Sequence, residues 1–510
     1  MEEKSNHTET TFFMNTLIVV ITGFAIKIMG LINRIIITRI LGTEGMSLYI
    51  LSFPTIMLFI NIASFCLYIS TSKLVSSSIQ NHLYSPRQIL KKSLKITFIV
   101  SISAIVILLI IIKPLTEDWL KNEKLFFPLL TTIILIPLVG ISDTLKGYFN
   151  GLKKMKIASM ATLIEQICRI AFSIGSLLIF MPYGIILATS ATLFALSIGE
   201  IGSIVFLIIK IKKFRPFHFP NTKGETKAIL EIAIPGTGTR LIGSITYFLE
   251  PIIYTSILIY LGYNKDEIQT HYTIINAYTI PLMTTASFLS LGIATAIIPS
   301  ISENYALNKM NSIRYYIKKG IVFAFVPGIL LSILFYTFPS EFMHLIYNTT
   351  EGASYIKRFI FIFIFYYLQA PLHAIMQGIG KSKLLFSTST FFNILRIILI
   401  ILFSAFPTIG LNSILYAILL TMVMNVLVIL YQLIKITSYR FDWQNIFNII
   451  ILTISTVALN LFLVKFVKLP YLIHSLILTF YFIIIGFVLK IIKIESLSFK
   501  RKKNWIGDLF

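Results

Sequence analysis

The sequence is poor in charged residues. Asp, Glu, Lys and Arg make up 13% of its 510 residues, whereas 56% are hydrophobic, and the mean hydropathy is +0.86. This composition is too apolar for a soluble globular protein. Carboxylates are especially scarce, with 21 acidic residues against 44 basic ones, so the formal net charge is +23. The composition therefore predicts a membrane protein that carries an excess of positive charge.

Residues that form catalytic or metal-binding motifs are also few. The two cysteines, Cys66 and Cys168, both lie in apolar segments, and the seven histidines lack the spacing of metal ligands. The sequence contains no phosphate-binding glycine loop, no HExxH zinc motif and no nucleophile elbow. We therefore expect no metal site, no cofactor and no enzymatic activity, and an ATP-driven pump is disfavoured.

Long apolar runs fill most of the chain. About 20 residues of helix cross ~30 Å of hydrocarbon, and fourteen segments are near or above this length. They are residues 12–33, 46–69, 94–112, 125–145, 157–180, 184–209, 228–262, 272–299, 317–338, 354–379, 384–406, 409–434, 446–467 and 470–492. The predicted fold class is an all-α integral membrane protein with 14 transmembrane helices.

The second half of the sequence repeats features of the first half. One constant shift along the chain places a glycine, two lysines, an arginine and a proline on residues of the same type. The pairs are Gly151 and Gly378, Lys154 and Lys381, Lys156 and Lys383, Arg169 and Arg396, and Pro54 and Pro281. A slightly smaller shift places Lys27 on Arg240. Matched cations in the apolar segments of both halves indicate an internal repeat and favour a transporter.

The repeat predicts two six-helix lobes. Residues 1–215 would form the first lobe, 216–227 a cytoplasmic linker and 228–435 the second lobe. Because six is an even number, the lobes share one orientation and are related by a pseudo-two-fold axis along the membrane normal, with the substrate site between them. Two additional transmembrane helices, 446–493, and a basic cytoplasmic tail, 494–510, are expected to follow.

The positions of Lys and Arg argue against a nucleic-acid-binding surface. Most of these residues lie in the connections after the even-numbered apolar segments and in the C-terminal tail. This is the positive-inside pattern of membrane proteins, and it predicts that both termini are cytoplasmic. We expect the basic tail to contact anionic lipid headgroups.

Four cations, Lys27, Arg169, Arg240 and Arg396, lie inside apolar segments. A cation at the bilayer centre costs ~2.5–3.5 kcal/mol, so each needs a charge partner or a wet cavity. Glu165 precedes Arg169 by four residues and can pair with it on one helix face, either as a structural pair or as part of a cavity. Arg396 has no such neighbour, and it either extends to the cytoplasmic interface or lines the cavity.

Other charged residues lack a partner on their own helix. Lys27 has no acidic residue within one turn, which favours a position in a cavity. Arg240 and Glu250 are about 15 Å apart at ~1.5 Å of helix per residue, so each needs another partner or water. Arg34 is an interface cation that could receive a phosphate. The carboxylates that are candidate charge partners or coupling sites are Glu165, Glu200 and Glu250.

Four stretches, residues 23–54, 142–171, 233–252 and 377–386, resemble polysaccharide-exporter flippases of the sporulation stage V protein B type. The resemblance covers residues 12–435. It implies membership of the multidrug/oligosaccharidyl-lipid/polysaccharide exporter superfamily, with 12 core helices plus two. MurJ-type lipid II flippases are relatives in which basic residues around a central cavity engage the lipid diphosphate, which implies this role for Lys27 and Arg34. Further arginines of those flippases, on helices 2 and 8, are replaced by apolar residues around Leu58 and Ile280.

The sequence thus predicts a flippase for a polyprenyl-diphosphate-linked oligosaccharide or peptidoglycan precursor, working by alternating access in the bacterial cytoplasmic membrane. The expected role is cell-wall or spore-cortex synthesis. Charge-assisted contacts to phosphate favour Arg and Lys, and the substrate-binding candidates are Lys27, Arg34, Arg169, Arg240 and Arg396. A cation-coupled multidrug or small-molecule exporter of the same superfamily is the alternative, and the coupling ion is open. A membrane glycosyltransferase would need a larger soluble loop than any here.

Overall fold

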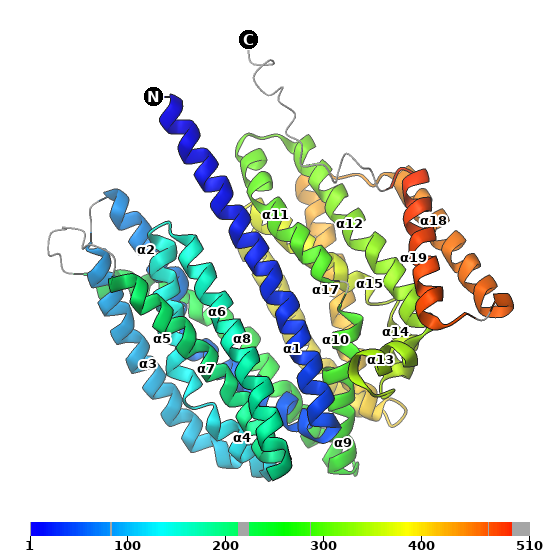
Figure 1. Cartoon of the computed structure of the whole chain (residues 1–510), viewed down its shortest axis with the longest axis horizontal. Helices are drawn as coiled ribbons and strands as arrows, with labels where there is room; N and C mark the ends of the chain where they lie inside the picture. The colour runs from blue at the N-terminus through cyan, green and yellow to red at the C-terminus, as the bar shows by residue number, and fades with distance from the viewer. Residues whose placement is uncertain (1, 82–83, 213–223, 286, 468, 492–510) are drawn as a thin grey trace. The chain divides into compact units, whose positions relative to one another are not determined.

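The computed structural model is built from helices and short connections in its described residues, 2–81, 84–212, 224–285, 287–467 and 469–491 (Figure 1). A helix satisfies its interior backbone N–H and C=O groups within its own segment, as hydrocarbon requires. The α-helices are α1 (Glu2–Ser64), α2 (Leu67–Asn81), α3 (Pro86–Pro114), α4 (Phe126–Thr131), α5 (Leu135–Gly151), α6 (Met155–Phe180), α7 (Ile185–Lys212), α8 (Glu225–Tyr260), α9 (Lys265–Thr273), α10 (Ile280–Met283), α11 (Ser287–Ala306), α12 (Met310–Thr337), α13 (Pro339–Tyr347), α14 (Ala353–Phe359), α15 (Ile364–Gly378), α16 (Ser382–Ser404), α17 (Ser413–Thr437), α18 (Trp443–Phe462) and α19 (Tyr471–Val488). Short 3₁₀ or π turns are η1 (Leu115–Trp119), η2 (Glu123–Leu125), η3 (Met181–Tyr183), η4 (Ile274–Thr279), η5 (Gly410–Asn412) and η6 (Leu463–Val467).

The long helix α1 contains a break at Gly42. The backbone there has φ 63° and ψ −170°, so two helices meet at this residue. A positive φ carries no steric penalty for glycine, which explains why the chain turns at this position. The first two predicted apolar segments, 12–33 and 46–69, lie on opposite sides of the break, and the second continues beyond the end of α1 into α2.

Eleven helices in the described part of the chain are long and apolar enough to cross a membrane. The number is twelve if α14 and α15, which are bent by 68° relative to each other, form one span. This count takes Thr22–Ile79 as one span, although the Gly42 break divides it. The predicted segment 272–299 is distributed over η4, α10 and α11. An all-α multi-pass architecture is confirmed, and the number of 14 helices stays a prediction.

The turns that follow α5 and α15 have the same backbone geometry. Lys153 and Gly380, which the repeat places at equivalent positions, have positive φ values of 59° and 74°. The next residue in each turn, Lys154 or Lys381, donates its N–H to the carbonyl five positions earlier at 2.9 Å. A left-handed residue that closes a helix in this way is a common C-terminal cap. The repeated sequence therefore repeats a helix end, while the parallel pseudo-two-fold arrangement of the lobes stays a prediction.

The chain divides into two compact units. The first comprises Met1–Leu282, Leu345–Gly352 and Ser382–Asn425, and the second Met283–His344, Ala353–Lys381 and Val426–Phe510. Within the first unit, α6 lies along α7 (Figure 1), and α8 packs against α1, α2 and α16. Within the second, α11 and α12 pack against α15, and α18 and α19 pack against α12. The predicted lobe boundaries stay a prediction; most of the linker 216–227 and the tail 494–510 lie outside the described residues.

Candidate functional site

A buried charge cluster joins α5, α6 and α7. Its members, called here the first-half cluster, are Lys146, Glu165, Arg169 and Glu200. Lys146 Nζ lies 2.6 Å from Glu165 Oε2 and 3.8 Å from Glu200 Oε2. Glu165 also pairs with Arg169 one turn further along α6. Lys146 and Glu165 are each 8% exposed and Glu200 is 6% exposed. Buried charges of this kind are tolerated only when paired, and here both signs are present.

A glycine brings α7 close to the first-half cluster. A methyl group on Gly199 would lie 2.8 Å from the backbone oxygen of Glu165 and 3.1 Å from Cβ of Arg169. Small residues allow two membrane helices to approach at such contacts. Glu200, the next residue on α7, is thereby held near the charges of α5 and α6.

The sequence predicted part of this cluster. The expected pairing of Glu165 with Arg169 is confirmed. Glu200, which had no assigned partner, lies near Lys146. Lys146 was not predicted, because it directly follows the apolar segment 125–145 and therefore falls in the expected connection after it. In the structure α5 continues through Lys146 to Gly151, which places this lysine inside a helix rather than in a loop.

Glu250 and Arg396 form an ion pair between α8 and α16. Arg396 Nη1 lies 3.5 Å from Glu250 Oε2, and its Nε is 3.5 Å from the hydroxyl oxygen of Thr421 on α17. The Glu250 side chain is 2% exposed and that of Arg396 is 28% exposed. From the sequence, Glu250 needed either a partner other than Arg240 or a wet cavity, and the structure supplies Arg396 from a distant part of the chain.

Lys27 and Arg240, which the smaller shift of the repeat relates, are both exposed side chains. Among the residues that the structure describes, neither lies within 4.0 Å of a carboxylate. Arg240 interacts electrostatically with Asp143, whose carboxylate accepts a hydrogen bond from Ser64. These two cations are thus the most exposed of the five candidate substrate-binding residues.

Arg34 is anchored through one end of its guanidinium group. Its Nη2 donates to the carbonyl oxygen of Asn276, in η4, at 2.8 Å. Its Nε is buried and donates to no acceptor in the described part of the chain. The side chains of Tyr49 and Tyr247 interact electrostatically with it. The protein therefore does not use the full hydrogen-bonding capacity of Arg34.

Hydrogen bonds near the Gly42 break connect α1 to segments of the second half of the sequence. Arg39 Nε donates to the carbonyl oxygen of Ile346 at 2.7 Å, and Thr43 donates to Glu351 Oε2 at 3.1 Å. All of these residues belong to the first unit. We call this set of contacts the Gly42-end contacts.

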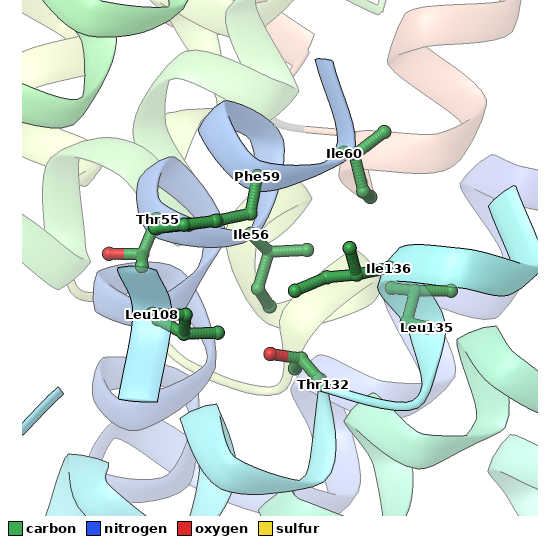
Figure 2. Close-up of a pocket in the computed structure, with 8 residues that line it drawn as sticks. All are labelled: Thr55, Ile56, Phe59, Ile60, Leu108, Thr132, Leu135 and Ile136. Atoms are coloured by element: carbon green, nitrogen blue, oxygen red, sulfur yellow. The ribbon is translucent and has the colours of Figure 1, made fainter. Parts of the chain in front are cut away.

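Two hollows in the structure do not include the intramembrane cations. Figure 2 shows the first, between α1, α3 and the α4–α5 turn, which has no room for a water molecule. Its lining residues are Thr55, Ile56, Phe59, Ile60, Leu108, Thr132, Leu135 and Ile136. The second, of about 590 Å³, lies beside the start of α8 and is lined by Thr226, Lys227, Leu230, Glu231, Ile234 and Pro235. The charged groups, rather than these hollows, define the candidate site.

No group of three or more potential metal ligands occurs within the described ranges. The expectation of no metal site and no cofactor stays a prediction.

Solved structures define the class of this fold. The chain aligns with a structure described as lipid II flippase MurJ in an inward closed conformation, with a TM-score of 0.69 and 14% identity over 94% of this chain and 100% of that one. The MATE multidrug transporter DinF-BH aligns with a TM-score of 0.58 and 15% identity, covering 83% and 95% of the two chains. The protein is therefore a multi-pass membrane protein with the fold shared by these transporters.

The sequence comparisons specify the family. The model of polysaccharide biosynthesis proteins matches residues 12–304, and the MatE model matches residues 245–402. The chain belongs to the polysaccharide biosynthesis protein family, and it is a transporter rather than an enzyme. Stage V sporulation protein B of Bacillus subtilis (strain 168) is 28% identical over 423 residues, which cover 81% of this chain and 82% of the relative. Lipid II flippase MurJ of the same organism is 23% identical over 411 residues, with coverages of 72% and 73%. The resemblance noted in the sequence is confirmed.

Proposed function

We propose that the protein translocates a polyprenyl-diphosphate-linked oligosaccharide or peptidoglycan precursor across the bacterial cytoplasmic membrane. The observation that carries this proposal is the position of Lys27 and Arg240, which are exposed within apolar helices and lack a carboxylate at ion-pair distance among the described residues. A cation in this position is costly unless it meets an anion or water. The diphosphate of a lipid-linked glycan is an anion that Lys and Arg bind well.

The proposed cycle is alternating access between the lobes 1–215 and 228–435. The diphosphate would bind to Lys27, Arg34, Arg169, Arg240 and Arg396 while the lipid tail stays in the bilayer. The Gly42-end contacts, which join the two halves of the sequence, would break in the state that opens at that end. The relation to a sporulation protein and to a lipid II flippase supports a lipid-linked substrate and a role in cell-wall or spore-cortex synthesis.

Single substitutions of the cations test this function. We expect Lys27→Ala, Arg240→Ala and Arg396→Ala each to reduce complementation of a flippase-depleted strain by tenfold or more, roughly the effect of losing 1.4 kcal/mol of binding. Membrane insertion should stay normal, because a cation is removed from an apolar segment. Arg440→Ala is the matched control, since Arg440 is exposed outside the membrane spans. Normal transport by all three inserted variants would exclude a cationic diphosphate site.

A cation-coupled drug or small-molecule exporter is the second candidate. The acidic residues of the first-half cluster favour it, because Glu200 Oε2 is buried and accepts no hydrogen bond from a described residue. In that case Glu165→Gln should abolish dye efflux, and Arg240→Ala should complement fully. In a flippase, Glu165→Gln should be mild and Arg240→Lys should retain partial activity, because Lys still offers a positive charge to phosphate.

The proposed location has both termini in the cytoplasm and the basic tail against anionic lipids. A reporter inserted at residues 210–227 or after Lys503 should therefore read cytoplasmic, and one at 264–267 should read external. An external reading at 210–227 would contradict the proposed orientation.

A further inference from the structure

The two residues of the Glu250–Arg396 ion pair differ in how far their side chains are exposed. Glu250 is almost completely buried, whereas more than a quarter of the Arg396 side chain is exposed. The contact is long, at 3.5 Å, and Glu250 Oε2 accepts no well-formed hydrogen bond from a described residue. A carboxylate and a guanidinium can form two parallel hydrogen bonds, so this pair uses only part of the hydrogen-bonding capacity of its two groups.

A second buried group near Glu250 also has unused hydrogen-bonding capacity. Tyr272, on α9, is 1% exposed, and its hydroxyl group has no hydrogen-bond partner in the described part of the chain. It interacts electrostatically with Glu250. By contrast, the nearby Tyr254 donates its hydroxyl hydrogen to Leu411 O at 2.8 Å. The ionic contact of Glu250 is therefore long, and a second buried group in its electrostatic surroundings also has no hydrogen-bond partner in the described part of the chain.

We propose that Glu250 is an internal competitor of the anionic substrate for Arg396. The inference rests on the proposed function and concerns how that site is regulated. In the observed state the carboxylate neutralises Arg396. A diphosphate that approaches the exposed edge of the guanidinium offers oxygens in a better geometry and displaces Glu250.

Displacement has a consequence for the helices. A buried carboxylate that has lost its cation is strongly unfavourable, so Glu250 must move to new partners when the diphosphate binds. Because Glu250 is on α8 and Arg396 on α16, this movement changes the contact between two helices that pack together in the first unit. Substrate binding is thereby linked to helix rearrangement, and part of the binding energy is used to break the ion pair.

The test measures binding of undecaprenyl diphosphate to the purified full-length protein in lipid nanodiscs, together with transport. Glu250→Gln removes the competing charge and keeps the side-chain shape, so we expect binding to become about tenfold tighter and transport to become slower. Arg396→Met should weaken binding of the diphosphate. The double variant Arg396→Met with Glu250→Gln should bind no more tightly than Arg396→Met alone, because the competitor acts only through Arg396. Glu341→Gln is the control, since it removes the same charge from an exposed position on α13.

Each outcome is decisive. Unchanged or weaker binding by folded Glu250→Gln overturns the competitor role while leaving the proposed function intact. Absence of binding by the native protein and by every variant overturns the proposed function and this inference together. If Glu250→Gln does not fold, Glu250→Asp, which keeps the charge but shortens its reach, should bind the diphosphate more tightly than the native protein, and failure to do so also overturns the proposal.

Discussion

The two halves of the sequence share their helix ends but not their buried charges. In the first half, Lys146, Glu165 and Glu200 form an ionic cluster among three helices. The shift that superimposes the two halves places His373, Phe392 and Leu427 at the corresponding positions of the second half. Arg169 therefore pairs with Glu165 on its own helix, whereas its repeat mate Arg396 depends on Glu250 from α8.

This difference indicates that two halves of a duplicated helical scaffold can place and pair their buried charges differently. The first-half cluster contains its own carboxylates, so its cations are neutralised where they stand. In the second half the equivalent arginine is partly exposed and has a single carboxylate partner among the described residues, Glu250, which we propose an anionic substrate displaces. The packing of a helix end tolerates such divergence because it depends on backbone shape and small residues, not on which charges lie further along the helix.

The largest expected effect is the loss of Lys146. Lys146→Met would leave Glu165 and Glu200 buried with one cation fewer, and breaking a buried ionic group in this way costs about 3–5 kcal/mol. We expect a marked decrease in the thermal unfolding temperature of the detergent-purified protein, measured by intrinsic fluorescence, and lower accumulation in the membrane.

The repeat supplies the control for this substitution. His373→Met replaces the corresponding residue, whose Nε2 is buried and has no hydrogen-bond partner in the described residues. Its effect should stay within about 1 kcal/mol, because no buried charge pair is broken. Equal losses of stability in Lys146→Met and His373→Met would show that the first-half cluster does not stabilise the protein more than the corresponding residues of the second half. The proposed difference between the two halves would then be wrong.

The next largest expected effect concerns the glycines Gly151 and Gly378, which the repeat places at equivalent helix ends of the two halves. A methyl group on Gly151 would lie 2.7 Å from the carbonyl oxygen of Ser72, and one on Gly378 would lie 2.7 Å from Cγ2 of Ile301. Both Gly151→Ala and Gly378→Ala should therefore destabilise the protein by about 1–3 kcal/mol. Gly151→Ala should have the larger effect, because backbone yields less easily than a side chain.

Gly175→Ala, in α6, is the matched control, since a methyl group there would meet nothing within 4 Å. It should be neutral or slightly stabilising, as alanine is the better helix former. Unfolding temperatures of the three variants measure these effects. A neutral Gly378→Ala beside a destabilising Gly151→Ala would mean that the second half has lost the shared packing as well as the charges.

The sequence predicted the class of fold because membrane helices depend mainly on local composition. Apolar runs of sufficient length are visible without any knowledge of packing. It was less informative where a helix breaks. The predicted segment 46–69 runs across the end of α1 at Ser64 into α2, and the 68° bend between α14 and α15 lies inside another single predicted segment.

The sequence predicted the site only where partners are close in the chain. Glu165 and Arg169 are one turn apart on α6, so helix geometry alone pairs them. Glu250 and Arg396 meet because α8 packs against α16, and no periodicity in either helix specifies that neighbour. Lys146 was missed for a related reason, since its importance comes from α6 and α7 rather than from its own flanking residues.

The smallest expected effect comes from an exposed ion pair, which tests whether burial rather than charge gives the first-half cluster its strength. Lys318 Nζ lies 2.5 Å from Asp442 Oδ2, with side-chain exposures of 39% and 40%. The hydrogen bond from Lys318 lowers the pKa of Asp442. A carboxyl group with a lowered pKa stabilises the folded state above its unfolded pKa, and this contribution is lost as the pH falls through the folded value. Solvent screening limits it to about 0–1 kcal/mol.

Two substitutions at Asp442 separate the ion pair from the helix cap. Asp442 is also the N-cap residue that precedes α18, and its side chain accepts a hydrogen bond from the Asn445 N–H at 3.3 Å. Asn is also a good cap, so Asp442→Asn should lose only the ion pair, whereas Asp442→Ala should lose about 0.5–2 kcal/mol more. Unfolding temperatures should show the difference between the native protein and Asp442→Asn at pH 7. This difference should begin to shrink as the pH falls to about 3.9, the ordinary pKa of Asp, and it should disappear only below the lowered pKa of the folded carboxyl group. A loss at pH 7 as large as that of Lys146→Met would mean that burial does not set the strength of these pairs.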